Sequence, residues 1–403
     1  MRNSSFTVLV ALSLGGCGDN SQAPVDAVTV VPDAAPDAPG PFAEALHGDP
    51  PQTVSLGGPV MVAPQIVPIF FHGDETAQSR VEQFLTELAA SQYWPITTSE
   101  YGVGPMTVRP TIVSADAPPT TDAALQAWIV AQTDGTHAGW PVPDGNTLYT
   151  VFLPSGVVLS TPSGNSCQTF GGYHDEAMGA SSKIIYALLP RCSSTNLDSV
   201  TTATSHELVE ATTDPFPTTD GAFQNVDPDH LVWGLTPGGE LGDMCEYVGL
   251  ADQRLVGAFA VQRTWSNAAA RAGHDPCVPA LTTPFLGAAP LLDERVTVDL
   301  GNQGGVLATK GVQVPLGMSK TIEVALFSDA PANDWTVKAT DAATVMGGGA
   351  ELSFAWDKTT GNNGDRLHLT ITRLKAGTGG SEFVVSSRIN GVSTSLWWGF
   401  VAN

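Results

Sequence analysis

The apolar positions between Phe42 and about Pro279 follow two different periods. Short continuous apolar runs predict buried strands, and apolar residues spaced at i, i+3, i+4 and i+7 predict amphipathic helices. Their interleaving predicts an α/β (α+β) domain over residues 42–280, with a mixed sheet covered by helices. The predicted strands are Val60–Phe71, Thr107–Val113, Thr147–Leu153 and Lys183–Leu189, and the predicted helices carry Val81, Phe84, Leu85, Leu88 and Ala89, then Ala124, Leu125, Trp128 and Ile129.

A different pattern occupies residues 285–403. Apolar and polar residues alternate there at period two, in short runs separated by Gly, Asn and Asp. About seven such strands predict an all-β immunoglobulin-like sandwich. His368 alternates with Leu367 and Leu369, so we expect it on the surface. The runs are 320–327, 335–339, 351–356, 366–372, 382–389 and 392–401.

The N-terminus predicts export and a lipid anchor. Arg2 precedes a short apolar run, Phe6–Leu14, which is typical of a signal peptide over residues 1–16. Leu14-Gly15-Gly16-Cys17 resembles the lipobox of bacterial lipoproteins, which predicts lipidation of Cys17. Residues 17–41 contain aspartates and prolines without a base or an aromatic residue, so we expect a disordered tether.

The charge balance excludes some classes of partner. Lys and Arg number 17 against 40 Asp and Glu, which gives a formal net charge of −23 at pH 7. Such a chain lacks the basic face that displaces counterions from nucleic acid, and an anionic membrane surface repels it. We therefore expect no nucleic-acid partner and membrane attachment only through the N-terminal lipid. The expected location is the cell envelope, at the outer membrane or cell surface, or the secreted fraction.

Four cysteines remain besides Cys17, and an even number in an exported protein predicts two disulfides. Three pairings are open. We expect Cys167–Cys192 and Cys245–Cys277, because shorter loops lose less entropy on closure. A four-cysteine zinc site is disfavoured, because no C-x-x-C spacing is present.

The segment Asp198–Pro215 holds the strongest candidate chemistry. Asp198 is placed to cap a helix, and Asp214-Pro215 is placed to end it. His206 and Glu210 are four residues apart and therefore lie on one helix face, as in the H-E-x-x-H zinc hydrolases, here with glutamate in place of the second histidine. The pattern predicts His206 and Glu210 as metal ligands and Glu207 as the catalytic base.

A zinc site needs a third protein ligand, and the loop Gly239–Cys245 offers two carboxylates. We expect Glu240 to complete the site and Asp243 to hold the ring nitrogen of His206 that faces away from the ion, although the two roles can be exchanged. His174 is an alternative ligand. His230 is a weaker candidate. The aspartates beside it, in the segment Asp227-Pro228-Asp229-His230, could instead bind calcium.

The donor set predicts a divalent metal, with Zn²⁺ first. One histidine and two carboxylates are harder ligands than two histidines and one carboxylate, so Mn²⁺ and Ca²⁺ also fit. The chain has no G-x-S-x-G element and no phosphate-binding glycine loop. A glycosidase that uses Glu207 and Glu240 stays open, because such an enzyme needs only two carboxylates.

Several segments together resemble the exordium-like, phosphate-induced secreted proteins and their bacterial relatives. The resemblance covers roughly Val54 to Val278 and implies an exported protein with the same helix, acidic loop and closing cysteine, but no particular reaction. The lipobox, the acidic tether and the C-terminal sandwich depart from that family. The matching segments are Gly58-Pro59-Val60, Gly172-Tyr173-His174, Ser205–Pro215, Glu240–Cys245, Val261–Asn267 and Cys277.

These observations predict an exported lipoprotein with a zincin-like, metal-dependent hydrolase domain, most simply a peptidase. The expected substrate is a peptide or a cell-envelope polysaccharide. The alternative is a non-catalytic adhesion or glycan-binding protein with a structural metal. An enzyme should keep an open position beside Glu207, whereas Asp243 and His174 together would close the site.

Overall fold

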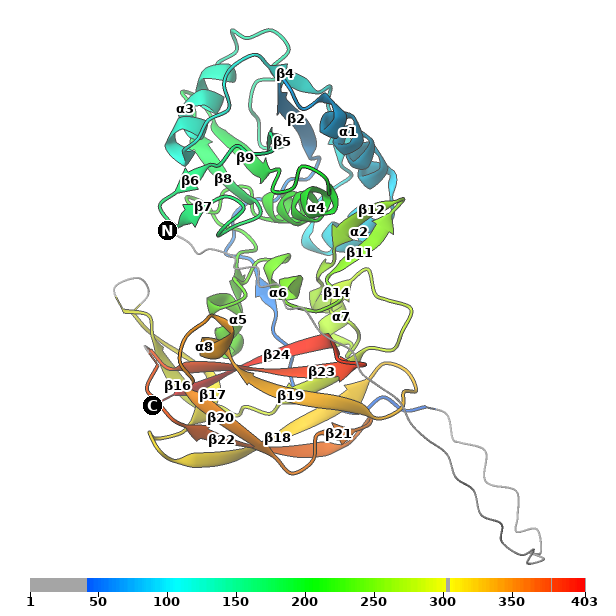
Figure 1. Ribbon diagram of the computed structural model, residues 1–403, viewed down its shortest axis with the longest axis vertical. Coiled ribbons are helices and arrows are strands. Elements are labelled where there is room, and N and C mark those ends of the chain that lie inside the picture. The colour runs from blue at the N-terminus through cyan, green and yellow to red at the C-terminus, as the bar shows by residue number, and fades with distance from the viewer. Residues whose placement is uncertain (1–41, 302–304, 378, 403) are drawn as a thin grey trace, which may run out of the picture.

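The computed structural model describes residues 42–301, 305–377 and 379–402. An α/β lobe lies above a β-sandwich lobe, and short helices and strands lie between them (Figure 1). The predicted signal peptide, lipidation site Cys17 and tether lie outside the described residues. Within those residues no helix is long and apolar enough to cross a membrane.

The α/β lobe is built on one six-stranded sheet with the order β3-β2-β5-β9-β8, in which β4 also pairs with β2. All neighbours are parallel except β8, which lies at the edge and runs antiparallel to β9. The predicted mixed sheet is therefore confirmed. The strands are β2 (Gln65–Phe71), β3 (Thr107–Val108), β4 (Ile112–Ser114), β5 (Thr147–Leu153), β8 (Tyr173–Met178) and β9 (Lys183–Pro190).

Two of the strands were predicted to be longer than they are. The strand expected from Val60 begins only at Gln65, directly after Pro64. The strand expected over Thr107–Val113 is two short strands, since Pro110 lies between them. Proline has no backbone N–H to give to a neighbouring strand, which accounts for the break at Pro110, although Pro68 is tolerated inside β2.

Helices cover both faces of this sheet. Helices α1 and α4 pack on one face against Ile66 and Phe70 of β2. Helix α3 packs on the other face against Val67 and Ile69 of the same strand. Because β2 is buried on both sides, its residues form a continuous apolar run. The helices are α1 (Glu75–Ala90), α2 (Tyr93–Thr98), η1 (Ser99–Tyr101), α3 (Asp122–Gln132) and α4 (Asp198–Thr213).

The lower lobe consists of two packed sheets. A four-stranded sheet has the order β15-β18-β22-β20, and a six-stranded sheet has the order β16-β17-β24-β23-β19-β21. Leu326 and Leu369 of the first sheet and Val385 and Val401 of the second meet in one core. The all-β character is confirmed, while the immunoglobulin-like topology stays a prediction. The strands are β15 (Leu286–Pro290), β16 (Glu294–Asp299), β17 (Val306–Gln313), β18 (Ser319–Ser328), β19 (Trp335–Asp341), β20 (Leu352–Trp356), β21 (Thr360–Gly361), β22 (Arg366–Arg373), β23 (Ser381–Ile389) and β24 (Val392–Ala402).

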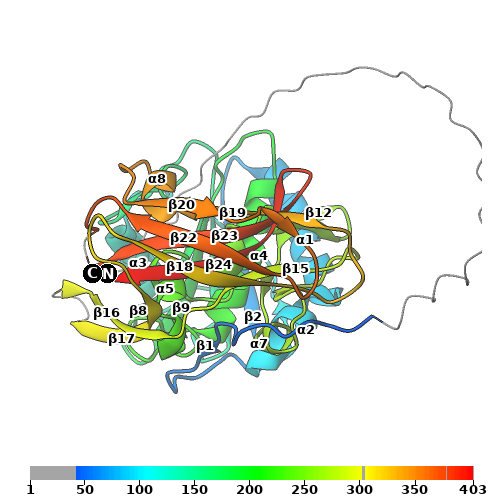
Figure 2. The ribbon, with the colours of Figure 1, turned by 90° about the horizontal axis from the view of Figure 1, so that it is seen from below.

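An aromatic seam joins the two lobes. The ring centroids of Trp233 and Trp397 are 6.2 Å apart, and those of Phe327 and Trp397 are 5.9 Å apart. Buried Met244 and Cys245 belong to the same apolar cluster. Viewed from below, the sandwich covers the end of the α/β lobe (Figure 2). This cluster therefore joins the sandwich to the short elements between the lobes and is separate from the two apolar clusters that flank the sheet of the α/β lobe.

Short elements complete the region above the seam. They include the two-stranded pairs β1–β10, β6–β7, β11–β12 and β13–β14. Their bounds are β1 (Thr53–Val54), β6 (Ser160–Thr161), β7 (Gly164–Asn165), β10 (Asn225–Val226), η2 (Pro228–His230), α5 (Val232–Leu235), α6 (Asp243–Glu246), β11 (Asp252–Val256), β12 (Phe259–Gln262), β13 (Thr264–Trp265), α7 (Asn267–Arg271) and β14 (Cys277–Val278), with α8 (Ala342–Val345) in the sandwich.

Both predicted disulfides are present. Cys167 is bonded to Cys192, and Cys245 is bonded to Cys277. The second bond ties α6 to β14, the strand that leads toward the sandwich. It therefore holds the acidic loop around Asp243 against the seam.

Candidate metal centre

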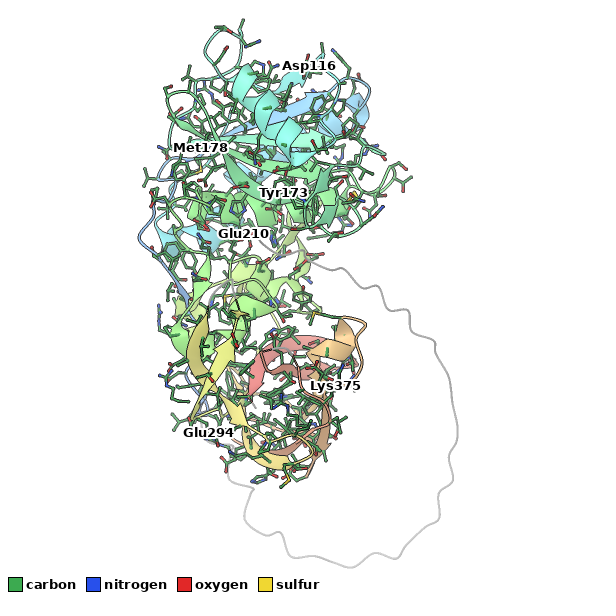
Figure 3. The ribbon with its side chains drawn as sticks, turned by 90° about the vertical axis from the view of Figure 1, so that its left-hand side faces the viewer. Asp116, Tyr173, Met178, Glu210, Glu294 and Lys375 are labelled. Carbon is green, nitrogen blue, oxygen red and sulfur yellow. A yellow bond between two sulfur atoms is a disulfide. The ribbon has the colours of Figure 1, made fainter. Side chains whose placement is uncertain are left out.

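Helix α4 is buried along most of its length, including every residue from Thr204 to Asp214. The residues His206, Glu207 and Glu210 are buried as well, with only 9%, 5% and 3% of each residue exposed. Burying several ionisable groups is costly unless they are paired or bind a cation. Glu210 lies on the side of the α/β lobe nearer the sandwich (Figure 3).

The predicted cap of this helix is wrong. Leu197 occupies the cap position, and no side chain caps the first turn there. Asp198 is the first helical residue, and its carboxylate pairs with Arg254 at 2.6 Å. A negative charge in the first turn still favours the helix, because the free backbone N–H groups lie at that end. The predicted end is correct, since the helix stops at Thr213 before Asp214-Pro215.

The side chains of His174, His206, Glu207, Glu210, Glu240 and Asp243 are referred to below as the cluster. Within it, the carboxylate of Glu210 is held by two backbone hydrogen bonds. Its Oε1 accepts hydrogen bonds from the backbone N–H groups of Gly242 and Asp243, at 3.0 and 3.1 Å. Its Oε2 is left facing Nε2 of His206 at 3.0 Å. A β-carbon at Gly242 would lie 2.5 Å from the His206 ring and 2.8 Å from Glu210, so only glycine permits this approach. The backbone of the acidic loop thus orients the carboxylate.

A glutamine fixes the orientation of the His206 ring. The side-chain amide of Gln262 donates to the carbonyl oxygen of Gly242 at 2.7 Å, which directs its own Oε1 toward Nδ1 of His206 at 3.1 Å. Nδ1 must therefore carry the proton and donate it. The opposite nitrogen, Nε2, is then the one available to a cation.

Asp243 does not have the position expected of it. We expected its carboxylate on the outward ring nitrogen of His206, but Gln262 holds that nitrogen. Asp243 lies on the other side of the ring, with Oδ1 at 3.7 Å from Nε2. It therefore faces the same space as Glu210 and belongs with the potential ligands.

Gln262 is the residue that the sequence reasoning missed. Its backbone N–H donates to the hydroxyl of Ser205 at 2.9 Å, and its carbonyl accepts from the hydroxyl of Tyr93 at 2.5 Å. The only signal was its place in the Val261–Asn267 segment that resembles the exordium-like proteins. Ser205 is part of this support and offers its hydroxyl hydrogen to the carbonyl of Thr202.

Strand β8 brings a second histidine to the cluster. Alternation along the strand directs Tyr173 to the α3 face, where its hydroxyl donates to Asp122, and directs His174 to the α4 face. Nδ1 of His174 lies 3.5 Å from Oε2 of Glu207 and 3.9 Å from Oε2 of Glu210. The other ring nitrogen, Nε2, is buried and has no hydrogen-bond partner among the described residues. The contacts of Nδ1 with the carboxylates of Glu207 and Glu210 therefore orient this ring.

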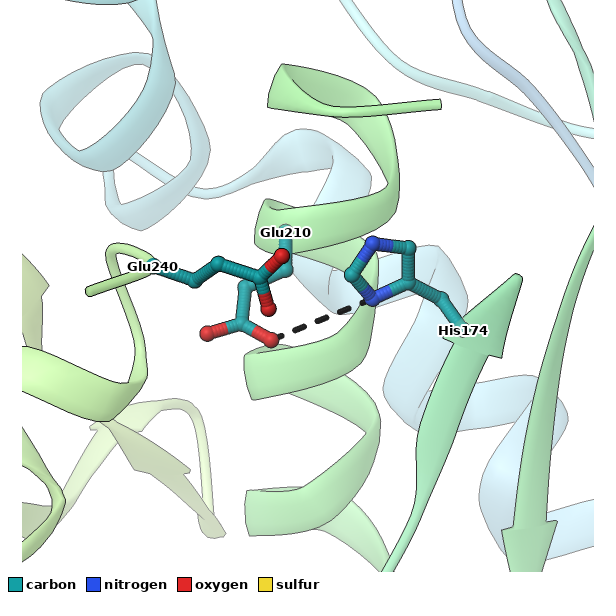
Figure 4. A group of neighbouring side chains, drawn as sticks. All are labelled: His174, Glu210 and Glu240. Atoms are coloured by element: carbon teal, nitrogen blue, oxygen red, sulfur yellow. Dashed lines mark ion pairs between the residues drawn. The ribbon is translucent and has the colours of Figure 1, made fainter. Parts of the chain in front are cut away.

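The donors form two groups of three that share Glu210. One contains His206, Glu207 and Glu210, and the other contains His174, Glu210 and Glu240, with the donor atoms of each group within 4.8 Å of one another. Figure 4 shows the second group, with Glu240 approaching from the acidic loop and His174 from β8. The structure thus brings together the three predicted ligands, the predicted base and the alternative ligand His174, but not His230.

The segment Asp227–His230, which we considered as a calcium site, lies outside the cluster. His230 lies in η2, where its Nδ1 pairs with the carboxylate of Asp227 at 2.9 Å. Asp229 pairs with Arg295 and Lys310 of the sandwich. These groups therefore join the lobes and are absent from both groups of potential ligands.

The pKa shifts show how strongly the cluster attracts positive charge. Burial lowers the pKa of the His174 ring, but the surrounding glutamates, Glu207 first, outweigh it and raise the pKa to about 10. The pKa of His206 is also raised, because Glu210 overcomes the effect of burial. Burial and the charge of Glu210 raise the pKa of Asp243. The cluster therefore favours the protonated forms of these three groups.

No protein-family model matches the chain, and no curated protein matches it. The resemblance to the exordium-like proteins therefore stays a prediction, and so does the zincin-like character of the domain.

Proposed function

We propose that this protein is a metal-dependent hydrolase, most simply a peptidase. The observation that carries the proposal is the 3.0 Å approach of His206 Nε2 to Glu210 Oε2. Since Nδ1 donates its hydrogen to Gln262, Nε2 and Oε2 can approach this closely only with a positive charge shared between them, which is either a proton on Nε2 or a metal ion. Two donors on one zinc ion, at about 2.0–2.2 Å each, are about 3.3–3.6 Å apart at a tetrahedral angle, so the observed 3.0 Å would have to widen by a few tenths of an ångström to admit the ion.

Glu207 is the proposed catalytic base. When bound, a divalent ion supplies a Lewis acid that acidifies water and polarises a carbonyl group. Glu207 can take a proton from the attacking water and pass it to the amine that leaves when the peptide bond breaks. The nearby ring of His174 holds Oε2 of Glu207 in a defined place.

A peptide substrate is favoured by the neighbouring sheet edge. Strand β8 carries His174 and, in the part of the chain that the structure describes, pairs only with β9. Extended peptides bind to such edges by adding a strand, which would place their backbone beside the cluster. A cell-envelope polysaccharide stays the second substrate class.

A second candidate function is a structural metal site in an adhesion or glycan-binding protein. The observation that favours it is the approach of both His174 and Asp243 to the cluster, together with its burial. A site closed by protein ligands leaves no position for substrate. Zn²⁺ is the first choice of metal for either function, and Mn²⁺ and Ca²⁺ also suit the carboxylates.

The deciding experiment is metal analysis of the full chain followed by a peptide-cleavage assay. We expect bound divalent metal in wild type and in the control His368→Ala, and its loss in His206→Ala. We also expect cleavage of a peptide library that a chelator stops and added Zn²⁺ restores. Metal without any cleavage would favour the structural site, and a metal-free wild type after exposure to Zn²⁺, Mn²⁺ and Ca²⁺ would refute both.

We further propose export and lipid anchoring at Cys17. The two disulfides support an oxidising compartment outside the cytoplasm. In a bacterial host, labelling with a fatty acid should mark the wild-type chain and not Cys17→Ser. Equal labelling of both would show that Cys17 is not the anchor.

A further inference from the structure

Two histidines reach the cluster from different elements, one from α4 and one from β8. Each belongs to a different group of potential ligands, and the two groups have Glu210 in common. Oε2 of this glutamate lies 3.0 Å from Nε2 of His206 and 3.9 Å from Nδ1 of His174. One carboxylate oxygen therefore faces both imidazoles.

The anchoring of Glu210 suits a shared ligand. Two backbone N–H groups hold its Oε1, so the carboxylate cannot turn without losing both hydrogen bonds. The orientation of Oε2 is thereby set by the acidic loop and not by either histidine. A bridging carboxylate needs such independent support, because the two ions repel each other across it.

The charge of the cluster argues for more than one divalent ion. Four carboxylates meet here, and those of Glu207, Glu210 and Asp243 form ion pairs with histidines. With both histidines neutral and all four carboxylates ionised, as ligands must be, a single divalent ion would compensate two of the four negative charges, and two ions would compensate all four. Uncompensated buried charge is costly, so the second ion lowers the free energy of the assembled site.

We infer that the cluster binds two divalent metal ions bridged by Glu210. His206 and Asp243, whose Oδ1 lies 3.7 Å from Nε2 of His206, hold one ion. His174 and Glu240 hold the other, and Glu207 is kept as the base. Two histidines and four carboxylates are also the donor set of dinuclear carboxylate centres in helical bundles, although the fold here is different. Paired ions about 3.5–4 Å apart are a known device for hydrolysis, since one can orient water while the other polarises the substrate.

This inference rests on the proposed metal-dependent function and makes it more specific. Glu207 is the fourth carboxylate and lies beside His174 at the second ion. It stays free to act as the base, because each ion already has a histidine, the bridging glutamate and one further carboxylate.

The test is the metal stoichiometry of the full chain, equilibrated with Zn²⁺ and in parallel with Mn²⁺, and then freed of unbound metal. We expect two ions per chain in wild type. His174→Ala and Glu240→Gln should each retain about one ion, a twofold loss. Glu176→Gln, which changes a buried carboxylate on β8 that bonds to Thr218 and Thr219, should keep two.

A second measurement avoids the risk that a variant fails to fold. Wild-type protein loaded with Mn²⁺ should give the electron paramagnetic resonance spectrum of a magnetically coupled pair. One ion per wild-type chain at saturation, or two ions with an uncoupled spectrum, would overturn the bridged pair and leave the proposed function in place. Complete absence of bound metal would overturn both.

Discussion

Two histidine–carboxylate pairs, one in each lobe, have nearly the same geometry and very different surroundings. His206 and Glu210 approach to 3.0 Å in the α/β lobe, with side chains 11% and 3% exposed. His368 and Asp357 approach to 2.8 Å in the sandwich, with side chains 52% and 42% exposed. Distance alone therefore does not distinguish a candidate site from an ordinary surface ion pair.

The difference lies in what else is near. Water solvates the pair on the sandwich, so its strength is limited by competition and by salt. The pair on α4 is enclosed by His174 of β8 on one side and by Gln262 of β12 and the acidic loop on the other, and the loop adds the carboxylates of Glu240 and Asp243. Enclosure removes water as a competing partner, so the buried carboxylates need protonated histidines or a bound cation to compensate their charge.

The largest expected effect concerns the base. Glu207→Gln should lower kcat/KM for a peptide substrate by about 10²–10⁴-fold, because an amide cannot take the proton from water. The metal content should stay at the wild-type level, as measured by elemental analysis on the same samples. Glu176→Gln is the matched control, and full activity of Glu207→Gln would show that another group is the base.

Removing a side chain from the aromatic seam should weaken the candidate metal centre, whereas removing one from the sandwich core should not. Trp397→Ala removes a ring that packs on Trp233 and lies in one cluster with Met244 of α6, and should cost about 3–5 kcal/mol of unfolding free energy. Trp335→Ala in the sandwich core should cost a similar amount.

Only the seam variant should also weaken metal binding, because α6 carries Asp243. Chemical unfolding and metal titration of both variants check this difference. Equal metal affinities in the two variants would show that the seam does not support the site.

A pH effect of intermediate size is expected at the seam. The carboxyl group of Glu382 in β23 accepts a hydrogen bond from Thr236, and burial raises its pKa to about 7. The folded state therefore favours the protonated acid. This contribution to stability is complete below about pH 4.5 and is lost as the pH rises through 7, on the order of 3 kcal/mol.

Glu382→Gln should remove that loss, because glutamine does not ionise. The unfolding free energy of wild type and variant, measured between pH 4 and 8, gives the comparison. Parallel curves for the two proteins would show that Glu382 does not titrate in this range.

The smallest effect is expected on the open face of the sandwich. His368→Ala should change the melting temperature by at most about 2 °C at neutral pH, since exposed pairs contribute little. Hydrogen bonds from His368 hold the pKa of Asp357 at about 2, so any contribution is lost only as the pH falls toward that value. A loss as large as that of Trp397→Ala would contradict the contrast between the lobes.

Local sequence patterns predicted those strands and helix ends that depend only on neighbouring residues. Apolar runs located β5 and β9, and the proline after Asp214 located the end of α4. The spacing of His206 and Glu210 placed both on one helix face, because the helix repeat is short. The disulfide pairing also followed from loop length.

Long-range contacts decided the remainder of the candidate site. His174 joins the cluster because β8 pairs with β9 at Ala187, a register that no local pattern contains. Gln262 takes the position expected of Asp243 because β12 packs beside α4 and aims an amide at the ring.

The sequence by itself determined which groups could bind a metal, because residue type and helical spacing are written in the chain. Only the tertiary structure decided how many of them meet and which nitrogen of each histidine faces the shared space. The physical reason is that desolvation and orientation are set by neighbours distant in sequence, whose packing depends on the whole core.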